Sequence, residues 1–201
     1  YSRYGYGGST PRPEGEFWPV EYMHHQARYA LPALLKALQL DQEKPILYGH
    51  SDGGSIALLY AAMHPDAVQS IIVAAPHIFV EDISISSIEQ AREAYLETNL
   101  RERLGRYHEV VDSAFWGWNN IWLDPEFRFW NIESYLPGIH CPILAIQGKQ
   151  DEYGTLEQIR GIKRIAKQAT LCIIEDCRHS PHFDQPEEVI TAVKQFLANG
   201  Q

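Results

Sequence analysis

The sequence predicts an α/β fold in which a doubly wound, mostly parallel sheet is interrupted by a helical insert. Three observations predict this fold class: four short apolar runs, helical periodicity in the segments between them, and one connection of about sixty residues. Helices cover both faces of a parallel sheet, so its strands read as nearly continuous apolar runs. The length of 201 residues fits one domain with an ample core.

The elements follow in order along the chain. Tyr1–Gly15 is rich in Gly, Pro, Tyr and Ser, which indicates a loop. Trp18–Leu40 carries apolar residues at helical spacing, and Pro32 is expected to kink this helix. The expected strands are Ile46–Tyr48, Ile71–Ala75, Ile143–Gln147 and Leu171–Glu175. The expected helices beside them are Asp52–His64, Leu156–Lys167 and Pro186–Ala198.

The long connection, residues 78–137, is expected to form a cap between two stretches of the core, 1–77 and 138–201. Its first part, Ser86–Arg106, is charged and helical in pattern, and its second part holds four of the five tryptophans. Two interpretations stay open: the aromatic residues wall a substrate pocket, or they form a small core that holds the insert together. The first makes these residues candidates for substrate binding: Trp116, Trp118, Trp122 and, just before the insert, His77.

A G-x-S-x-G motif, Gly49-His50-Ser51-Asp52-Gly53, lies between the first strand and the helix after it. In this setting the motif predicts a nucleophile elbow, in which the serine adopts a strained backbone at the strand end. Gly49 and Gly53 are expected to fill places without room for a Cβ atom. The helix start aims N–H groups, that of Asp52 first, at a developing oxyanion. The competing interpretation is a glycine-rich turn that caps a buried helix.

Ser51 needs a base and an orienting acid, and the expected chain order is Ser, acid, His. Asp151 follows the third strand and His179 follows the fourth, so both lie at the sheet edge where Ser51 lies. Glu152 and His182 stand close enough in sequence to compete for these roles. The predicted catalytic residues are therefore Ser51, Asp151 and His179, with Glu152 and His182 as alternatives.

Composition limits the partners. The net charge of −9 argues against nucleic acid and anionic membranes as partners. The expected partner is therefore a small-molecule substrate. The oligomeric state stays open, with a homo-oligomer among the alternatives. Three cysteines, Cys141, Cys172 and Cys177, are odd in number and lack metal spacing, which favours the reducing cytoplasm. Cys177, His179 and His182 lack a second ligand cluster, so neither a metal nor another cofactor is expected.

Four segments together resemble the α/β-hydrolase fold family: Arg3–Ser9, Gly49–Gly53, Gly148–Asp151 and His179–Pro181. The resemblance covers essentially the whole chain. It implies that Ser51 attacks a carbonyl, His179 moves the proton, Asp151 holds the imidazole, and water releases the acyl group. Members of this family have further strands and a second oxyanion donor ahead of the segment matched by Tyr1. We therefore expect a piece of a longer enzyme, or a chain with little activity by itself.

Asp52, directly after the nucleophile, is the best indication of the substrate. One interpretation is an acidic residue that suits the helix dipole. The other follows from Ser51–Gly54 and Cys141-Pro142, which resemble the valacyclovir hydrolase or biphenyl-hydrolase-like group. In that group the equivalent carboxylate receives the ammonium of α-amino acid esters. The expected function is a serine esterase; the alternatives are a carbon–carbon bond hydrolase of ring-cleavage products and a non-catalytic relative that binds ligands.

Overall fold

The computed structural model describes residues 1–199, and its contacts divide the chain into two compact units. The sheet unit consists of Tyr22–Phe79 and the chain from Asn131 onward. The insert unit consists of Val80–Trp130 together with Tyr1–Glu21. The insert is thus shorter than the expected 78–137, and the first residues of the chain pack with it rather than with the core.

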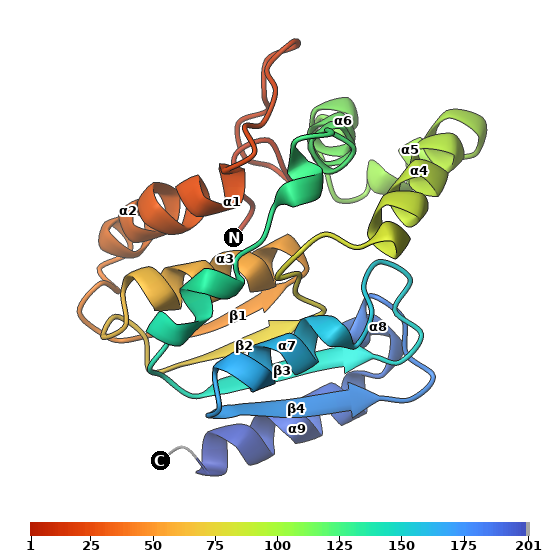
Figure 1. Ribbon diagram of the computed structural model, residues 1–201. Helices are drawn as coiled ribbons and strands as arrows, with labels where there is room; N and C mark the ends of the chain where they lie inside the picture. The colour runs from red at the N-terminus through yellow and green to blue at the C-terminus, as the bar shows by residue number, and fades with distance from the viewer. Residues whose placement is uncertain (200–201) are drawn as a thin grey trace. The chain divides into compact units, whose positions relative to one another are not determined.

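The sheet of the sheet unit has four parallel strands in the order β1-β2-β3-β4 (Figure 1). Their bounds are Ile46–His50 for β1, Ser70–Ala74 for β2, Ile143–Gly148 for β3 and Ala169–Ile174 for β4. In the register, Ile71 of β2 pairs with Leu47 on one side and with Ile143 on the other. The predicted parallel sheet is confirmed, with strand ends that differ by a few residues from the expected ones.

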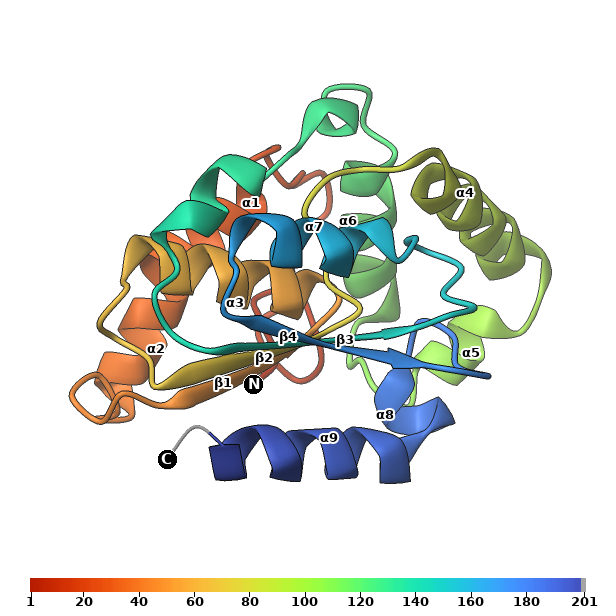
Figure 2. The same ribbon diagram turned by 60° about the horizontal axis from the view of Figure 1, so that its bottom comes forward.

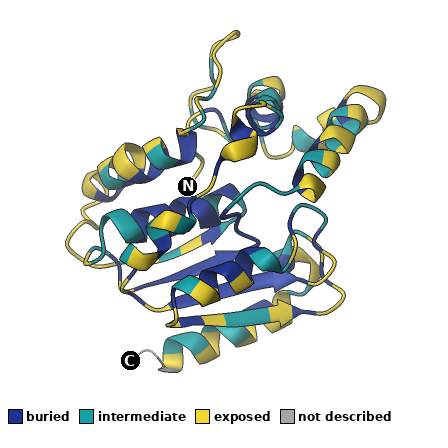
Figure 3. Ribbon diagram, viewed as in Figure 1, coloured by how far each residue is buried: buried dark blue, intermediate teal, exposed yellow. Residues whose placement is uncertain are grey.

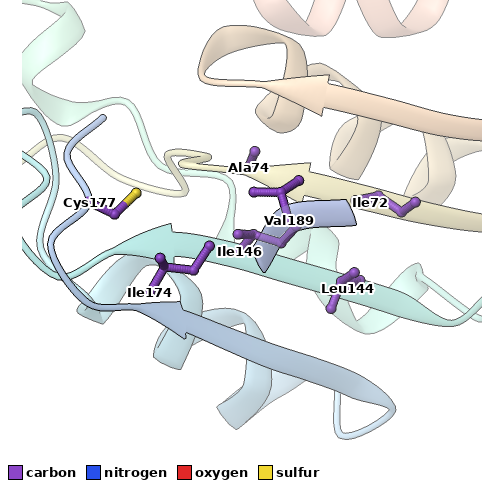
Figure 4. Close-up of a cluster of buried hydrophobic side chains, with 7 residues drawn as sticks. All are labelled: Ile72, Ala74, Leu144, Ile146, Ile174, Cys177 and Val189. Carbon is purple, nitrogen blue, oxygen red and sulfur yellow. The ribbon is translucent and has the colours of Figure 1, made fainter. Parts of the chain in front are cut away.

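Helices cover both faces of this sheet. Figure 2 shows α3 (Asp52–Met63) and α7 (Glu157–Ile165) on one face and α9 (Pro186–Asn199) on the other. Alternate strand residues turn to α9, where a cluster of buried side chains forms (Figure 4): Ile72, Ala74, Leu144, Ile146, Ile174, Cys177 and Val189. The residues between them, such as Val73 and Ala145, are fully buried as well. Figure 3 shows how burial differs between the strands: β2 and β3 are buried along their length, and β1 and β4, at the edges of the sheet, have exposed positions.

The helical run before β1 consists of α1 (Tyr22–His25), a π-helical turn η1 (Gln26–Ala30) and α2 (Leu31–Ala37). The irregularity lies one turn ahead of Pro32, which occupies the start of α2. A π turn at this place avoids the clash between a proline ring and the carbonyl four residues earlier. The buried stripe of this run, which includes Met23 and Ala27, packs on α3.

Two short helices complete the sheet unit. The 3-10 helix η3 (Glu133–Gly138) packs against α3 and α7. Helix α8 (Pro181–Asp184) precedes α9. No helix within residues 1–199 combines the length and the apolar character that a membrane crossing requires.

The insert unit contains α4 (Asp82–Glu97), α5 (Leu100–Leu104), α6 (Val111–Trp122) and the 3-10 helix η2 (Phe127–Phe129). Helices α4 and α6 are joined by polar and aromatic contacts: Arg92 Nε donates to Asn119 Oδ1 at 2.7 Å, and the Tyr95 and Phe115 rings stack with centroids 3.7 Å apart. Arg12, from the first segment, donates through its main-chain N–H to Ser113 Oγ at 2.8 Å and through its guanidinium to the Ser113 carbonyl at 2.9 Å. These bonds explain why the first residues belong to this unit.

Candidate active site

The nucleophile elbow forms where β1 ends at His50 and α3 begins at Asp52. Ser51 between them has φ 54° and ψ −123°, a conformation that side-chain-bearing residues rarely adopt. Hydrogen bonds fix it from both sides, because the Ser51 N–H donates to the Ala74 carbonyl at 2.9 Å and the Ser51 carbonyl accepts from the Gly54 N–H at 2.8 Å. The surrounding structure thus holds a backbone that costs of order 1–3 kcal/mol at a functional site.

The glycines around Ser51 differ in what they do. A Cβ on Gly49 would lie against the Gly53 carbonyl, closer than van der Waals contact allows. A Cβ on Gly53 would meet nothing within 4 Å, whereas one on Gly54 would lie 3.0 Å from Pro76 Cβ. The expectation for Gly53 was therefore wrong: the close approach of strand and helix requires glycine at 49 and favours it at 54, because Gly54 faces the loop after β2.

Three side chains from three strand ends meet in the sheet unit. His179 Nε2 lies 3.0 Å from Ser51 Oγ, and His179 Nδ1 lies 2.8 Å from Asp151 Oδ1. Since a carboxylate only accepts, Nδ1 carries the proton of the neutral ring and Nε2 is left to accept from the serine hydroxyl. The structure brings together the residues that the sequence predicted as nucleophile, acid and base, in the hydrogen-bonded order that a Ser-His-Asp triad requires.

Asp151 is held as an ionised carboxylate. Its side chain is 1% exposed, its Oδ2 accepts from Gln147 Nε2 at 3.1 Å, and its Oδ1 also accepts from the Tyr153 N–H at 2.9 Å. Burial acts to raise the pKa of Asp151, but the hydrogen bond and charge of His179, with the Tyr153 N–H, lower it below its ordinary value. The acid therefore stays charged where its partner imidazole needs a negative neighbour.

The two alternatives take other places. Glu152 Oε2 accepts from the main-chain N–H of His179 at 3.2 Å, so Glu152 holds the backbone of the base while Asp151 holds its ring. His182 stacks edge-on against His50, with ring centroids 4.8 Å apart, and its Nδ1 is buried with no hydrogen-bond partner among the described residues. The ring that bonds to Ser51 belongs to His179.

Asp52 and His77 are both buried near the three candidate catalytic residues. The Asp52 side chain accepts from the Tyr22 hydroxyl through Oδ2 at 2.8 Å, and the residue is 6% exposed. His77, 3% exposed, donates from Nε2 to the Tyr153 carbonyl at 3.0 Å, and its ring lies 5.9 Å from that of His179 between centroids. Burial, and next the charge of His179, lower the pKa of His77, so this ring stays neutral. These contacts give His77 a role in fixing the acid loop.

The three candidate tryptophans of the insert lie on α6, and each packs within the insert unit. Trp122 is 1% exposed and contacts the Phe127 ring at 5.1 Å between centroids. Trp116 and Trp118 are half-buried and lie edge-on to Phe115. These contacts form the aromatic core of the insert unit; the role of the same residues as the wall of a pocket stays a prediction.

Sequence reasoning missed several polar residues that support the site. Gln147, 1% exposed, bonds to both Asp151 and the Gly154 carbonyl, and the Ser55 hydroxyl donates to the His77 carbonyl at 2.6 Å. A polar residue inside an otherwise apolar strand or helix was the available signal. Within residues 1–199, the three cysteines are free, and no cluster of His, Cys, Asp and Glu has the arrangement of a metal site.

Comparisons with known proteins identify the family of the chain. A profile of the alpha/beta hydrolase family matches residues 1–192. The human protein named serine hydrolase BPHL is 26% identical over 205 residues, which cover 96% of this chain and 66% of that protein. The chain thus spans just under two thirds of the length of this curated relative, which belongs to the group that the Ser51–Gly54 segment resembles.

Two solved structures share the fold. A bacterial membrane phospholipase A superposes with a TM-score of 0.74 at 24% identity, covering 98% of this chain and 68% of the other. A meta-cleavage product hydrolase from Pseudomonas fluorescens IP01 gives a TM-score of 0.67 at 16% identity, covering 94% and 75%. At such identities the likeness shows the fold alone. The match of the profile to nearly the whole chain shows more: this chain belongs to the alpha/beta hydrolase family.

Proposed function

We propose that the protein is a serine hydrolase that cleaves small carboxylic esters through an acyl-enzyme. The observation that carries the proposal is the continuous hydrogen-bond chain from Ser51 Oγ through His179 to the buried carboxylate of Asp151. The serine stands on a strained elbow at the start of α3, which places its oxygen at the end of β1. Each of these features is needed for nucleophilic catalysis and none is needed for a structural turn.

In the proposed reaction, Ser51 Oγ bonds to the ester carbonyl carbon while its proton passes to His179 Nε2. The negative oxygen that forms lies at the start of α3, where the Asp52 N–H and the helix dipole stabilise it. Collapse of this intermediate breaks the carbon–oxygen bond to the alcohol, which takes the proton from His179. Water then attacks the acyl group with the same base and releases the acid and free Ser51.

Labelling by a fluorophosphonate probe tests this function in the full-length protein. We expect the wild type to be labelled and to turn over p-nitrophenyl esters, and the Ser51→Ala variant to do neither. Ser134→Ala is the matched control, because Ser134 is an exposed serine of the same unit. Absence of labelling in the wild type would favour a non-catalytic relative. Turnover of a vinylogous diketone in preference to every ester would replace the ester bond by a carbon–carbon bond.

For the substrate class we propose esters of α-amino acids, in which Asp52 receives the ammonium group. The support is a buried carboxylate one residue from the nucleophile, which accepts a hydrogen bond from the Tyr22 hydroxyl at 2.8 Å. A buried carboxylate gains most from a cationic partner, since charge is stabilised poorly by burial alone. The group that includes the human relative was the reason to expect this chemistry, and the position of Asp52 agrees with it.

Paired esters with and without the α-amino group separate this proposal from the helix-dipole interpretation of Asp52. We expect Asp52→Asn to lower kcat/KM for the amino ester by roughly 10- to 100-fold and to change the deamino ester little, because a hydrogen bond to a charged group contributes about 1.5–3 kcal/mol. Tyr22→Phe is the control, because it removes the hydroxyl that bonds to Asp52 and keeps the Asp52 carboxylate. An equal loss for both esters in Asp52→Asn would show that the carboxylate has another role.

A further inference from the structure

His50 precedes the nucleophile and bonds to the residue that serves as its base. It is the last residue of β1, and its Nε2 lies 2.7 Å from the main-chain carbonyl oxygen of His179. Because a carbonyl oxygen only accepts, Nε2 of His50 carries a proton and donates it to this bond. Two consecutive residues therefore reach the same partner: His50 binds the backbone of His179, and Ser51 binds its ring.

The backbone of His179 is held on its other side as well. Its N–H donates to Glu152 Oε2 at 3.2 Å, from the loop after β3. Earlier residues of the base loop bond to the acid loop and to α8: the Gln150 N–H donates to the Cys177 carbonyl at 2.9 Å, and the Arg178 N–H donates to Asp184 Oδ2 at 2.8 Å. These bonds fix the base relative to the acid. The bond from His50 fixes it relative to the nucleophile strand.

We propose that His50 is a positioning residue of the hydrolase: its Nε2–H holds the His179 carbonyl and thereby sets the distance between His179 Nε2 and Ser51 Oγ. This inference rests on the proposed function. The residue before the serine is the unspecified x of the G-x-S-x-G motif. The inference gives this position a role in placing the base.

The state of the His50 ring suits a fixed donor. Burial, followed by the charge of His179, lowers the pKa of His50 to about 4, and His182 adds to the lowering while Asp151 opposes it. A ring that stays neutral near pH 7 keeps one proton, on Nε2, and does not repel the imidazolium that forms on His179. The edge-on contact with His182, at 4.8 Å between centroids, holds the plane of the His50 ring.

Three substitutions of His50 test the bond by its geometry. In glutamine the amide nitrogen reaches the place of Nε2, whereas in asparagine it reaches only the place of Nδ1, and phenylalanine keeps the ring without any donor. We expect His50→Asn and His50→Phe to lower kcat for a p-nitrophenyl ester by roughly 10- to 100-fold with KM within twofold of wild type, since small misplacements of a base have effects of this size. We expect His50→Gln to restore kcat to within about threefold of wild type.

His140→Asn is the matched control, because it makes the same substitution at an exposed histidine of the sheet unit; its kcat should stay within about twofold. Melting temperatures identify variants that lose activity by unfolding, and if His50→Phe does not fold, the comparison of His50→Gln with His50→Asn decides. Wild-type kcat in His50→Asn or His50→Phe would overturn the inference, as would equal kcat in folded Gln and Asn variants. If the wild type does not react with a fluorophosphonate, the proposed function itself is wrong. If the wild type and His50→Asn are labelled at equal rates, only the role of His50 is wrong.

Discussion

The backbone strain at Ser51 predicts that a glycine at this position makes the protein more stable than an alanine does. Ser51→Gly and Ser51→Ala both remove the hydroxyl, so both lose its hydrogen bond to His179 Nε2 and the loss cancels between them. They differ in the Cβ atom, which remains in alanine. At φ 54° and ψ −123°, that Cβ is the source of the strain, and glycine alone is free of it.

The magnitude follows from two opposing terms. Holding a residue with a Cβ in such a conformation costs of order 1–3 kcal/mol. The glycine variant loses about 0.4–1 kcal/mol of unfolding free energy relative to alanine, because its unfolded chain has more conformational freedom. The free energy of unfolding of Ser51→Gly should therefore exceed that of Ser51→Ala by about 1 kcal/mol, which raises Tm by roughly 2–4 °C in a chain of this size.

Urea unfolding followed by circular dichroism, with calorimetry as a second measurement, gives both quantities for the two inactive variants. Their common inactivity removes any influence of bound substrate or product. If Ser51→Gly is equal to or less stable than Ser51→Ala, the elbow stores no strain at this residue and the argument fails.

Three further predictions follow from the site. Asp151→Asn should lower kcat by about 10⁴-fold, as expected when the orienting carboxylate of a triad is lost, and a decrease below tenfold in an ester assay would contradict its role. Gly49→Ala should destabilise by about 1–3 kcal/mol because its Cβ meets the Gly53 carbonyl, while Gly53→Ala should keep Tm and activity; equal Tm values for the two would show that the elbow is not close-packed. His50 has a folded-state pKa of about 4, so its neutral form stabilises the fold above pH 6.5 and this stabilisation falls as the pH drops toward 4, by about 3 kcal/mol in the wild type. Urea unfolding at pH 7 and pH 4.5 should show a smaller loss in His50→Gln, and the same loss in both proteins would be evidence against a neutral buried ring.

The fold and the positions of the three catalytic candidates could be predicted from local patterns. Continuous apolar runs indicated the parallel strands, and the carboxyl ends of parallel strands share one edge, so the loops that carry Ser51, Asp151 and His179 had to lie together. The choice between Asp151 and Glu152 was harder, because both follow the same strand. The conformation of the loop decides, because Asp151 accepts a hydrogen bond from the Tyr153 N–H. In this conformation Asp151 points toward the ring of His179, and Glu152 points toward the main-chain N–H of His179.

What the sequence could not indicate depends on contacts between distant residues. Tyr22 lies 30 positions from Asp52, and His50 lies 129 positions from the carbonyl it binds, so no local pattern marks either pair. The glycine motif was also misleading at Gly53, because its spacing does not say which glycine faces another backbone. The membership of the first residues in the insert unit depends on contacts such as that of Arg12, whose partner Ser113 is 101 positions away.

The two junctions of residues 80–130 with the sheet unit make this segment suited to exchange by design. Phe79 and Asn131 form a β-bridge, and the Ile132 N–H donates to the Ile78 carbonyl at 2.8 Å, so the chain leaves and re-enters the sheet unit at neighbouring points. A segment with adjacent ends can be transplanted between relatives without opening the sheet. Such a chimera must carry two pieces, however, because Tyr1–Glu21 belongs to the same unit as Val80–Trp130. A graft of residues 80–130 alone would remove the residues that the first segment contacts, such as Ser113, which Arg12 binds.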